Sequence, residues 1–195
     1  MSVLMTLIGI FIVLVIFAVS IYNRLIELRN RFKNAYSQID VQLQRRYELI
    51  PNIIETAKAY LTHERETLTQ VIEARNQAVS VSKIAAQNPN QIHSLEKLGQ
   101  AESFLNQTLG KLFAVSEAYP DLKANESMAS LTEELSSTEN KIAFARQAFN
   151  DDVMIYNTYR EMFPNSLIAG TMHFKEAPLL EISDEKARQP IAVKF

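Results

Sequence analysis

The first 23 residues contain no Asp, Glu, Lys or Arg, so the 20 basic and 22 acidic residues of this 195-residue chain all follow Asn23. Residues 3–21 form an apolar run that is interrupted only by Thr6, Gly9 and Ser20. As a helix this run is roughly 28 Å long, close to the thickness of a bilayer's hydrocarbon core. A helix also satisfies its own backbone hydrogen bonds in lipid. We therefore predict that residues 1–23 are a transmembrane anchor that contacts the lipid bilayer through residues 3–21.

A cleavable signal peptide is the alternative interpretation of the same segment. Signal peptides begin with a positively charged region, and no basic residue precedes this apolar run. However, Ala18-Val19-Ser20 has the small-x-small pattern of a cleavage site. The sequence favours the retained anchor and leaves the cleaved form open.

The flanking charges predict the orientation of the anchor. Arg24, Arg29, Arg31 and Lys33 follow the apolar run, whereas no Lys or Arg precedes it. Basic residues beside a membrane helix mark its cytoplasmic side. We therefore predict a single-pass protein with its N-terminus outside and the rest of the chain in the cytoplasm.

After residue 24 the apolar residues recur every three or four positions, which is typical of amphipathic helices. Prolines at 89, 120 and 164 interrupt this pattern and divide it. Four helices are expected, at about 24–48, 51–86, 91–118 and 126–163, with a short helix near 166–172. The predicted fold is all-α: a transmembrane helix followed by an antiparallel four-helix bundle over residues 24–172. Residues 173–195 are expected to form an extended tail that packs in part through Leu179 and Leu180.

Pro51 leaves the first helix boundary open, because proline removes one backbone hydrogen bond within a helix. Either a helix ends near Tyr47 and another begins with Pro51 in its first turn, or one long helix kinks at Pro51 and continues to about Ala86. The unbroken apolar stripe favours the kink. The length of such a helix, which would have no equally long partner, favours the break.

Composition argues against several classes of function. The chain has no Cys, three His and four Gly, and its net charge is −2. Disulfides, thiol nucleophiles and Cys-ligated metals are excluded, and a basic nucleic-acid-binding surface is not expected. His63-Glu64 lacks a second His at position 67, which is Thr, so it is not a zinc-binding HExxH motif. No cofactor, metal or nucleic-acid partner is predicted.

Polar residues are frequent on the predicted first bundle helix, and further polar residues occur on the predicted last helix. A sharper interpretation than a plain solvated face is a half-buried polar layer in which Arg46 pairs with Glu139, with Gln42 and Asn140 completing its hydrogen bonds. Such a layer would fix the register of the helices. A plain solvated face and a ligand-binding or catalytic role remain as alternatives. The candidate residues of this layer or of an interaction surface are Asp40, Gln42, Arg46, Asn52, Glu139, Asn140 and Arg146.

Several linked strings between Tyr22 and about Phe174 resemble the LemA family of bacterial membrane proteins. These strings are Tyr22-Asn23-Arg24-Leu25, Ser37-Gln38-Ile39-Asp40-Val41-Gln42-Leu43, Leu49-Ile50-Pro51-Asn52, Tyr119-Pro120-Asp121-Leu122-Lys123-Ala124-Asn125 and Thr138-Glu139-Asn140-Lys141-Ile142-Ala143-Phe144-Ala145-Arg146. The resemblance implies an N-terminally anchored four-helix domain in the bacterial inner membrane, and it favours ending the first helix near Pro51. One branch of the family resembles magnetosome-membrane proteins, which suggests a role in membrane organisation.

The sequence therefore predicts a membrane-anchored interaction or scaffold protein without catalytic activity. Its expected partners are an unidentified protein or further copies of itself as a homo-oligomer. The alternative is a small-ligand-binding or enzymatic bundle that uses the polar layer around Arg46 and Glu139.

Overall fold

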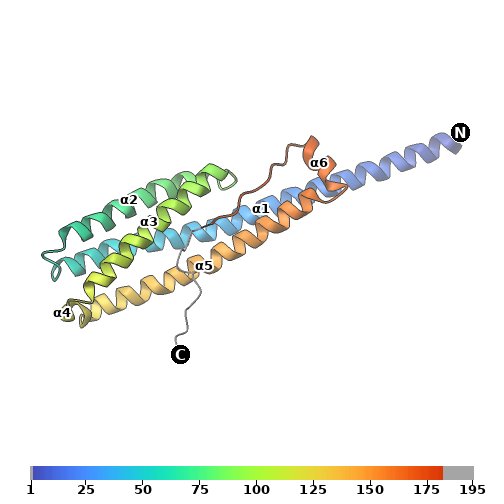
Figure 1. Ribbon diagram of the computed structural model, residues 1–195. Coiled ribbons are helices and arrows are strands. Elements are labelled where there is room, and N and C mark those ends of the chain that lie inside the picture. Colours follow the sequence, from blue (N-terminus) through green and yellow to red (C-terminus); the bar gives the residue numbers. More distant parts are fainter. Residues whose placement is uncertain (1, 182–195) are drawn as a thin grey trace, which may run out of the picture.

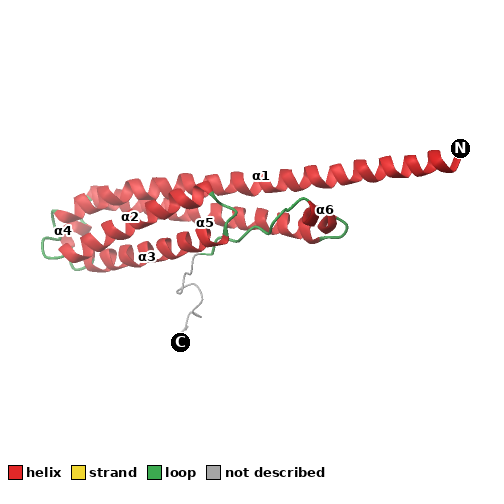
Figure 2. Ribbon diagram, turned by 90° about the horizontal axis from the view of Figure 1, so that it is seen from above, coloured by secondary structure: helices red, strands yellow, loops and turns green. Residues whose placement is uncertain are grey.

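The computed structural model describes residues 2–181, which form six helices and no strand (Figures 1 and 2). The helices are α1 Ser2–Lys58, α2 Arg65–Gln87, α3 Ile92–Ser116, α4 Pro120–Lys123, α5 Glu126–Glu161 and α6 Asn165–Thr171. The predicted all-α fold is confirmed, and so is the short helix expected near 166–172, which is α6.

The four long helices run antiparallel to their neighbours along the chain (Figure 1). α1 packs chiefly against α5, and α2 packs chiefly against α3, so the bundle consists of two helical pairs. The one-turn helix α4 carries the chain from α3 to α5. Asn125 begins α5 as its N-cap, with its side-chain oxygen accepting a hydrogen bond from the Met128 backbone N–H at 2.9 Å.

α1 contains two different stretches within one uninterrupted helix. The N-terminal part of the helix extends beyond the bundle (Figure 2). Before Ile21 its apolar side chains are exposed, apart from the half-buried Ala18. This is the one helix among residues 2–181 that is long and apolar enough to span a membrane, with a mean hydropathy of 3.0 over 18 residues. From Ile21 onward a single stripe of side chains is buried in the bundle. The candidate anchor therefore continues into the bundle without a loop.

Aromatic packing joins α1 to α5 in the core. The Phe32 ring lies 5.2 Å from Tyr156 and 6.3 Å from Phe149, and the Tyr36 ring lies 5.7 Å from Phe149. All four side chains are buried. Large buried rings in tilted or edge contact dominate the energy of such a core.

The break expected near Pro51 was wrong, and the alternative of one continuous helix was right about the passage through Pro51 but wrong about the end near Ala86. α1 neither ends near Tyr47 nor continues to Ala86; it passes through Pro51 and ends at Lys58. Pro51 has no N–H to donate to the Tyr47 carbonyl four residues earlier. Arg75 on α2 supplies the missing donor, since its Nε lies 3.1 Å from that oxygen. A residue from another helix thus compensates for the proline.

The chain turns between α1 and α2 at residues 59–64. Leu61 is buried in this turn, and its backbone N–H donates to the Ala57 carbonyl at 2.9 Å. Glu64, a charged residue between the apolar Leu61 and Leu68, lies in this turn. The following helix begins at Arg65 without a side-chain cap.

After α6 the chain runs back along α5 as an extended segment, residues 174–181, which we call the C-terminal strap. Asn157 donates to the Ala177 carbonyl at 2.8 Å and accepts from the Ala177 N–H at 2.9 Å. Two turns earlier on α5, Asn150 makes the same pair of bonds with Leu180, at 3.3 and 2.9 Å. In the expected tail, Leu180 is buried and Leu179 is 41% exposed, and residues 182–195 lie outside the described part of the chain.

Gly99 on α3 makes room for the end of this strap. A Cβ atom built at position 99 would lie 2.4 Å from the Glu181 carbonyl oxygen. Glycine therefore allows the strap to pass directly over α3.

We predict that Arg75→Met lowers the free energy of unfolding by about 1–2 kcal/mol, because it leaves the Tyr47 carbonyl without a donor. In a Pro51→Ala background the new backbone N–H at position 51 can donate to that carbonyl, so the effect of Arg75→Met should shrink. Chemical unfolding of the unchanged protein, the two single variants and the double variant in detergent micelles measures the coupling between Arg75 and Pro51. Additive effects of the two substitutions would contradict the explanation.

Candidate functional site

Arg46 is a charged residue of α1 that lies in the bundle core. Its side chain is 3% exposed and forms an ion pair with Glu102 of α3, whose side chain is fully buried, with 2.9 Å between Nη1 and Oε2. Arg46 Nε has no partner among the described residues. Such pairs cost much desolvation energy, so they are seldom present for stability alone.

The Glu102 carboxylate also accepts a hydrogen bond from the Tyr47 hydroxyl. Burial raises the pKa of Glu102, and Arg46 and Tyr47 oppose this shift by stabilising the carboxylate. Burial and the neighbouring Glu102 raise the pKa of the Tyr47 hydroxyl as well. Tyr47 therefore stays protonated and serves as a donor to Glu102.

The second guanidinium nitrogen of Arg46 points towards the surface. Nη2 donates to the Asn106 side-chain oxygen of α3 and lies 3.4 Å from Oε1 of Glu139 on α5. Arg46, Asn106, Glu139 and Arg146 line a shallow pocket of about 330 Å³ there. We call Arg46, Tyr47, Glu102, Asn106 and Glu139 the polar cluster.

The structure brings together only part of the predicted layer. Arg46 and Glu139 pair, as expected, and Arg146 lies at the same pocket. Within residues 2–181, neither Gln42 nor Asn140 hydrogen-bonds to Arg46, so that part of the prediction was wrong. The reason is that α3, which the prediction left out, supplies Glu102 and Asn106 instead.

The other two candidates are not members of the polar cluster, although Asp40 and Tyr47 line one pocket. Asp40 accepts hydrogen bonds from Ser82 at 3.3 Å and from Gln44 at 3.1 Å. Asn52 is exposed on α1, where its backbone carbonyl accepts from the Thr56 hydroxyl. Neither residue contacts Arg46 or Glu139 in an ion pair or hydrogen bond that the structure records for residues 2–181.

One sequence signal pointed to Glu102. The apolar stripe of α3 has leucines at 95, 98, 105, 109 and 112, and the missing turn of the stripe falls at 101 and 102. A glutamate at a core position of an amphipathic helix needs a buried partner, such as a cation or a hydrogen-bond donor. Arg46 is the buried cation that meets this need.

The polar cluster uses its charges internally. Arg46 has two carboxylates around it, and Glu102 has Arg46 and Tyr47, so none of its buried charges is left free for a substrate. Residues 2–181 hold no group of three or more His, Asp or Glu side chains arranged for a metal ion. The geometry suits a cross-link between helices.

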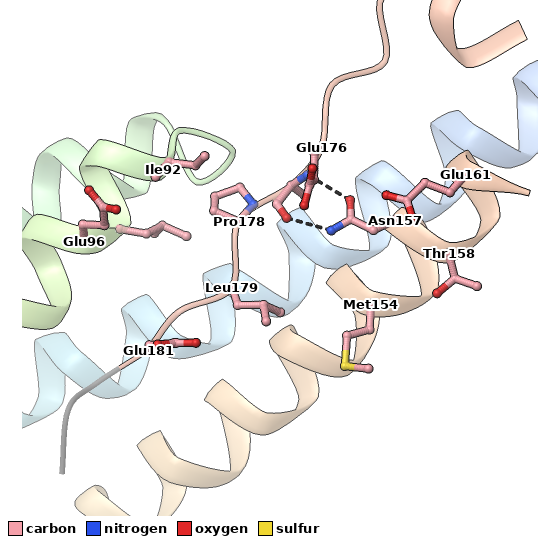
Figure 3. A pocket seen from close by; sticks show the side chains of 12 residues that line it. Ile92, Glu96, Met154, Asn157, Thr158, Glu161, Glu176, Pro178, Leu179 and Glu181 are labelled. Carbon is pink, nitrogen blue, oxygen red and sulfur yellow. Dashed lines mark hydrogen bonds between the residues drawn. The ribbon is translucent and has the colours of Figure 1, made fainter. Parts of the chain in front are cut away.

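A larger groove of about 540 Å³ lies between the start of α3, α5 and the C-terminal strap (Figure 3). Its apolar side chains include Ile92, Met154 and Leu179, each more than one third exposed. Its acidic side chains are Glu96, Glu161, Glu176 and Glu181. Arg160 balances part of this charge, with its Nη2 atom 2.8 Å from Glu161 and 3.7 Å from Glu176.

A family model of the LemA family matches residues 35–195, which is most of the chain. The chain belongs to the LemA family. The matched region contains most of the bundle, including every residue of the polar cluster, whereas the candidate anchor precedes it.

Individual relatives are distant. The chain is 24% identical over 162 residues to Protein LemA of Metamycoplasma hominis, covering 83% of this chain and 69% of that protein. It is 23% identical over 170 residues to Magnetosome protein MamQ of Magnetospirillum gryphiswaldense, covering 79% of this chain. The chain spans only 62% of the length of that MamQ protein. A MamQ protein of Paramagnetospirillum magneticum is 22% identical over 172 residues.

We predict that Arg46→Met lowers the free energy of unfolding by about 3–5 kcal/mol at pH 8, because it leaves Glu102 buried and uncompensated. Loss of Arg46 raises the pKa of Glu102 further above its value in the unfolded chain. Because the pKa of the Glu102 carboxyl is then higher in the folded protein than in the unfolded chain, the folded state is favoured at low pH. This stabilisation is lost as the pH rises through the folded-state pKa. The deficit of Arg46→Met should therefore be smaller at pH 5 than at pH 8.

Chemical unfolding in detergent micelles at the two pH values measures this difference. Arg46→Met/Glu102→Gln is the matched control, since it removes the titrating carboxyl and should show no such pH dependence. An Arg46→Met variant with the same deficit at both values would contradict the assignment of Glu102 as the buried charge.

Proposed function

We propose that this LemA-family chain is a membrane-anchored interaction protein that presents a fixed surface to a protein partner. The observation that carries the proposal is the continuity of α1. One helix supplies both the exposed apolar segment before Ile21 and the buried stripe from Ile21 to Ala57. Without a loop between them, the bundle stands on the anchor in a fixed direction, which suits the presentation of a surface.

The groove between α3, α5 and the C-terminal strap is the surface that we assign to this partner. Its four glutamates outnumber the single Arg160, and Ile92, Met154 and Leu179 offer apolar contact. Complementary charge directs association, and apolar side chains supply the contact energy. The occupant is therefore a segment of a protein partner that combines Lys or Arg with apolar side chains.

The alternative of a ligand-binding or enzymatic bundle has the pocket beside Arg46 and Glu139 in its favour. Its buried charges are, however, already paired with each other. If the polar cluster is structural, Arg146→Ala should change the stability little, because Arg146 only lines the pocket. Binding of a small molecule that is abolished by Arg146→Ala in a folded protein would favour the alternative.

Site-specific photocross-linking tests the groove. A benzophenone amino acid replaces Met154 in the groove or, as the matched control, Phe144, an exposed α5 residue that does not line it. We expect a discrete adduct with another protein from position 154 only. Reversal of two charges by Glu96→Lys and Glu176→Lys should reduce that adduct about tenfold, because like charges then face each other.

Three outcomes would contradict this assignment. They are equal adducts from positions 154 and 144, no adduct from position 154, and an adduct that survives the charge reversals. An adduct between two copies of the chain would show that the groove binds a second copy and not a different protein.

We further propose the orientation with the N-terminus outside and the bundle in the cytoplasm of the bacterial cell. The chain has no cysteine, so Phe144→Cys introduces a single label site on the bundle. A membrane-impermeant maleimide should label this site only after the inner membrane is opened. Labelling of intact spheroplasts would place the bundle outside, and an intact mass that lacks about the first 20 residues would identify a cleaved signal peptide.

A further inference from the structure

A second exposed apolar surface lies at the end of the bundle from which α1 emerges. Residues 162–172, which we call the α6 tip, contain no Asp, Glu, Lys or Arg. Phe163 is 80% exposed, and Met162, Leu167 and Met172 are each more than half exposed. An uncharged surface with four such side chains is unusual on a water-facing loop.

The register between α1 and α5 shows which part of α1 lies level with the α6 tip. Arg31 of α1 pairs with Asp152 of α5, with 2.8 Å between Nε and Oδ1. Since the two helices are antiparallel and rise equally per residue, Glu161, nine residues after Asp152, lies level with Tyr22, nine residues before Arg31. The α6 tip begins at the next residue, and Tyr22 adjoins the end of the uncharged segment of α1.

The α6 tip is held against α1 in this position. The Phe174 ring, just after the tip, contacts the Tyr22 ring edge to face at 5.6 Å. The guanidinium carbon of Arg29 lies 5.3 Å from the centre of the same Phe174 ring. Asn165 within the tip donates a hydrogen bond from its side chain to the Tyr159 carbonyl at 2.9 Å. These contacts fix α6 beside α1 where the apolar segment ends (Figure 1).

We propose that the α6 tip inserts into the interfacial layer of the same bilayer that α1 spans. The inference rests on the proposed membrane anchor. Phe163, Leu167, Met162 and Met172 would enter the boundary between headgroups and acyl chains, as the apolar face of an interfacial helix does. The bundle then touches the membrane at two places, α1 and the α6 tip, and the second contact sets the direction in which the bundle faces.

Basic side chains near the α6 tip suit contact with a lipid surface. Arg24 on α1, which pairs with Glu27 at 2.7 Å, and Lys175 at the start of the strap are exposed near the uncharged surface, as are Glu161 and Glu176. Basic side chains at this level can reach lipid phosphates while the apolar residues enter the acyl region.

Tryptophan fluorescence tests the proposal in the full chain reconstituted into liposomes. The protein contains no Trp, so Phe163→Trp makes the α6 tip its single indole. Phe144→Trp is the control on the water-exposed side of α5, and Phe11→Trp is the control in the centre of the apolar segment. All three phenylalanines are more than half exposed, so the exchange adds no clash in the core.

Lipids brominated near the headgroup or near the chain end act as quenchers at two depths. We expect the indole at position 163 to emit at short wavelength and to lose on the order of twofold more intensity with bromine near the headgroup than with bromine near the chain end. Position 11 should show the reverse order. Position 144 should be quenched by aqueous iodide and by neither lipid.

The controls separate the possible failures. Quenching at position 11 but iodide quenching at position 163 would overturn the contact of the α6 tip and leave the anchor intact. Iodide quenching at both positions would overturn the anchor itself. Short-wavelength emission at position 163 without lipid quenching would identify a second copy of the chain on this surface, and it would overturn the proposal as well.

Discussion

The continuity of α1 is the constraint on which the rest of the structure depends. A helix in lipid must be apolar on all sides, whereas a helix in a bundle must be apolar along one stripe. The change occurs at Ile21, where the first buried side chain of α1 appears within a helix that has no break. The direction of the anchor and that of the bundle are thereby linked. α5, packed along α1, then carries the α6 tip back to the same level.

The polar cluster answers a problem created by this architecture. α1 packs chiefly on α5 and α2 chiefly on α3, so the two pairs need a contact that fixes their relative register. Two apolar stripes can shift by one helical turn with little change in buried area. Such a shift would separate Arg46 from Glu102, so the ion pair fixes the register. The Tyr47 hydroxyl and Glu139 add further directed contacts from α1 and α5. The buried charges are best explained as a device for specificity rather than for stability, consistent with the known cost of such pairs.

The parts of the fold that could be predicted depend on the local sequence pattern. The parts that could not be predicted depend on contacts with other helices. The uncharged run before Asn23 and the spacing of Leu25, Leu28 and Phe32 are sufficient to predict helix. The helix boundary at Pro51 could not be settled from the sequence because the donor that rescues the Tyr47 carbonyl is Arg75, 28 residues after Tyr47 and on a different helix. Glu102 and Asn106, two of the five residues of the polar cluster, were missed for the same reason, since both lie on α3. Glu139 could be paired with Arg46 from the sequence, whereas Glu102 was visible only as a gap in a stripe of leucines.

The position of the groove narrows the kind of partner that can use it. By the pairing of Arg31 with Asp152, Met154 lies level with residue 29 of α1 and Glu161 with Tyr22. This part of the groove therefore begins at the membrane end of the bundle and extends about 10 Å from it. A basic segment reaches this height most easily when it is itself close to a bilayer, where anionic lipids already attract it. The groove and the α6 tip would therefore act together: the tip would hold the bundle at the lipid surface, and the groove would select basic juxtamembrane segments of other proteins.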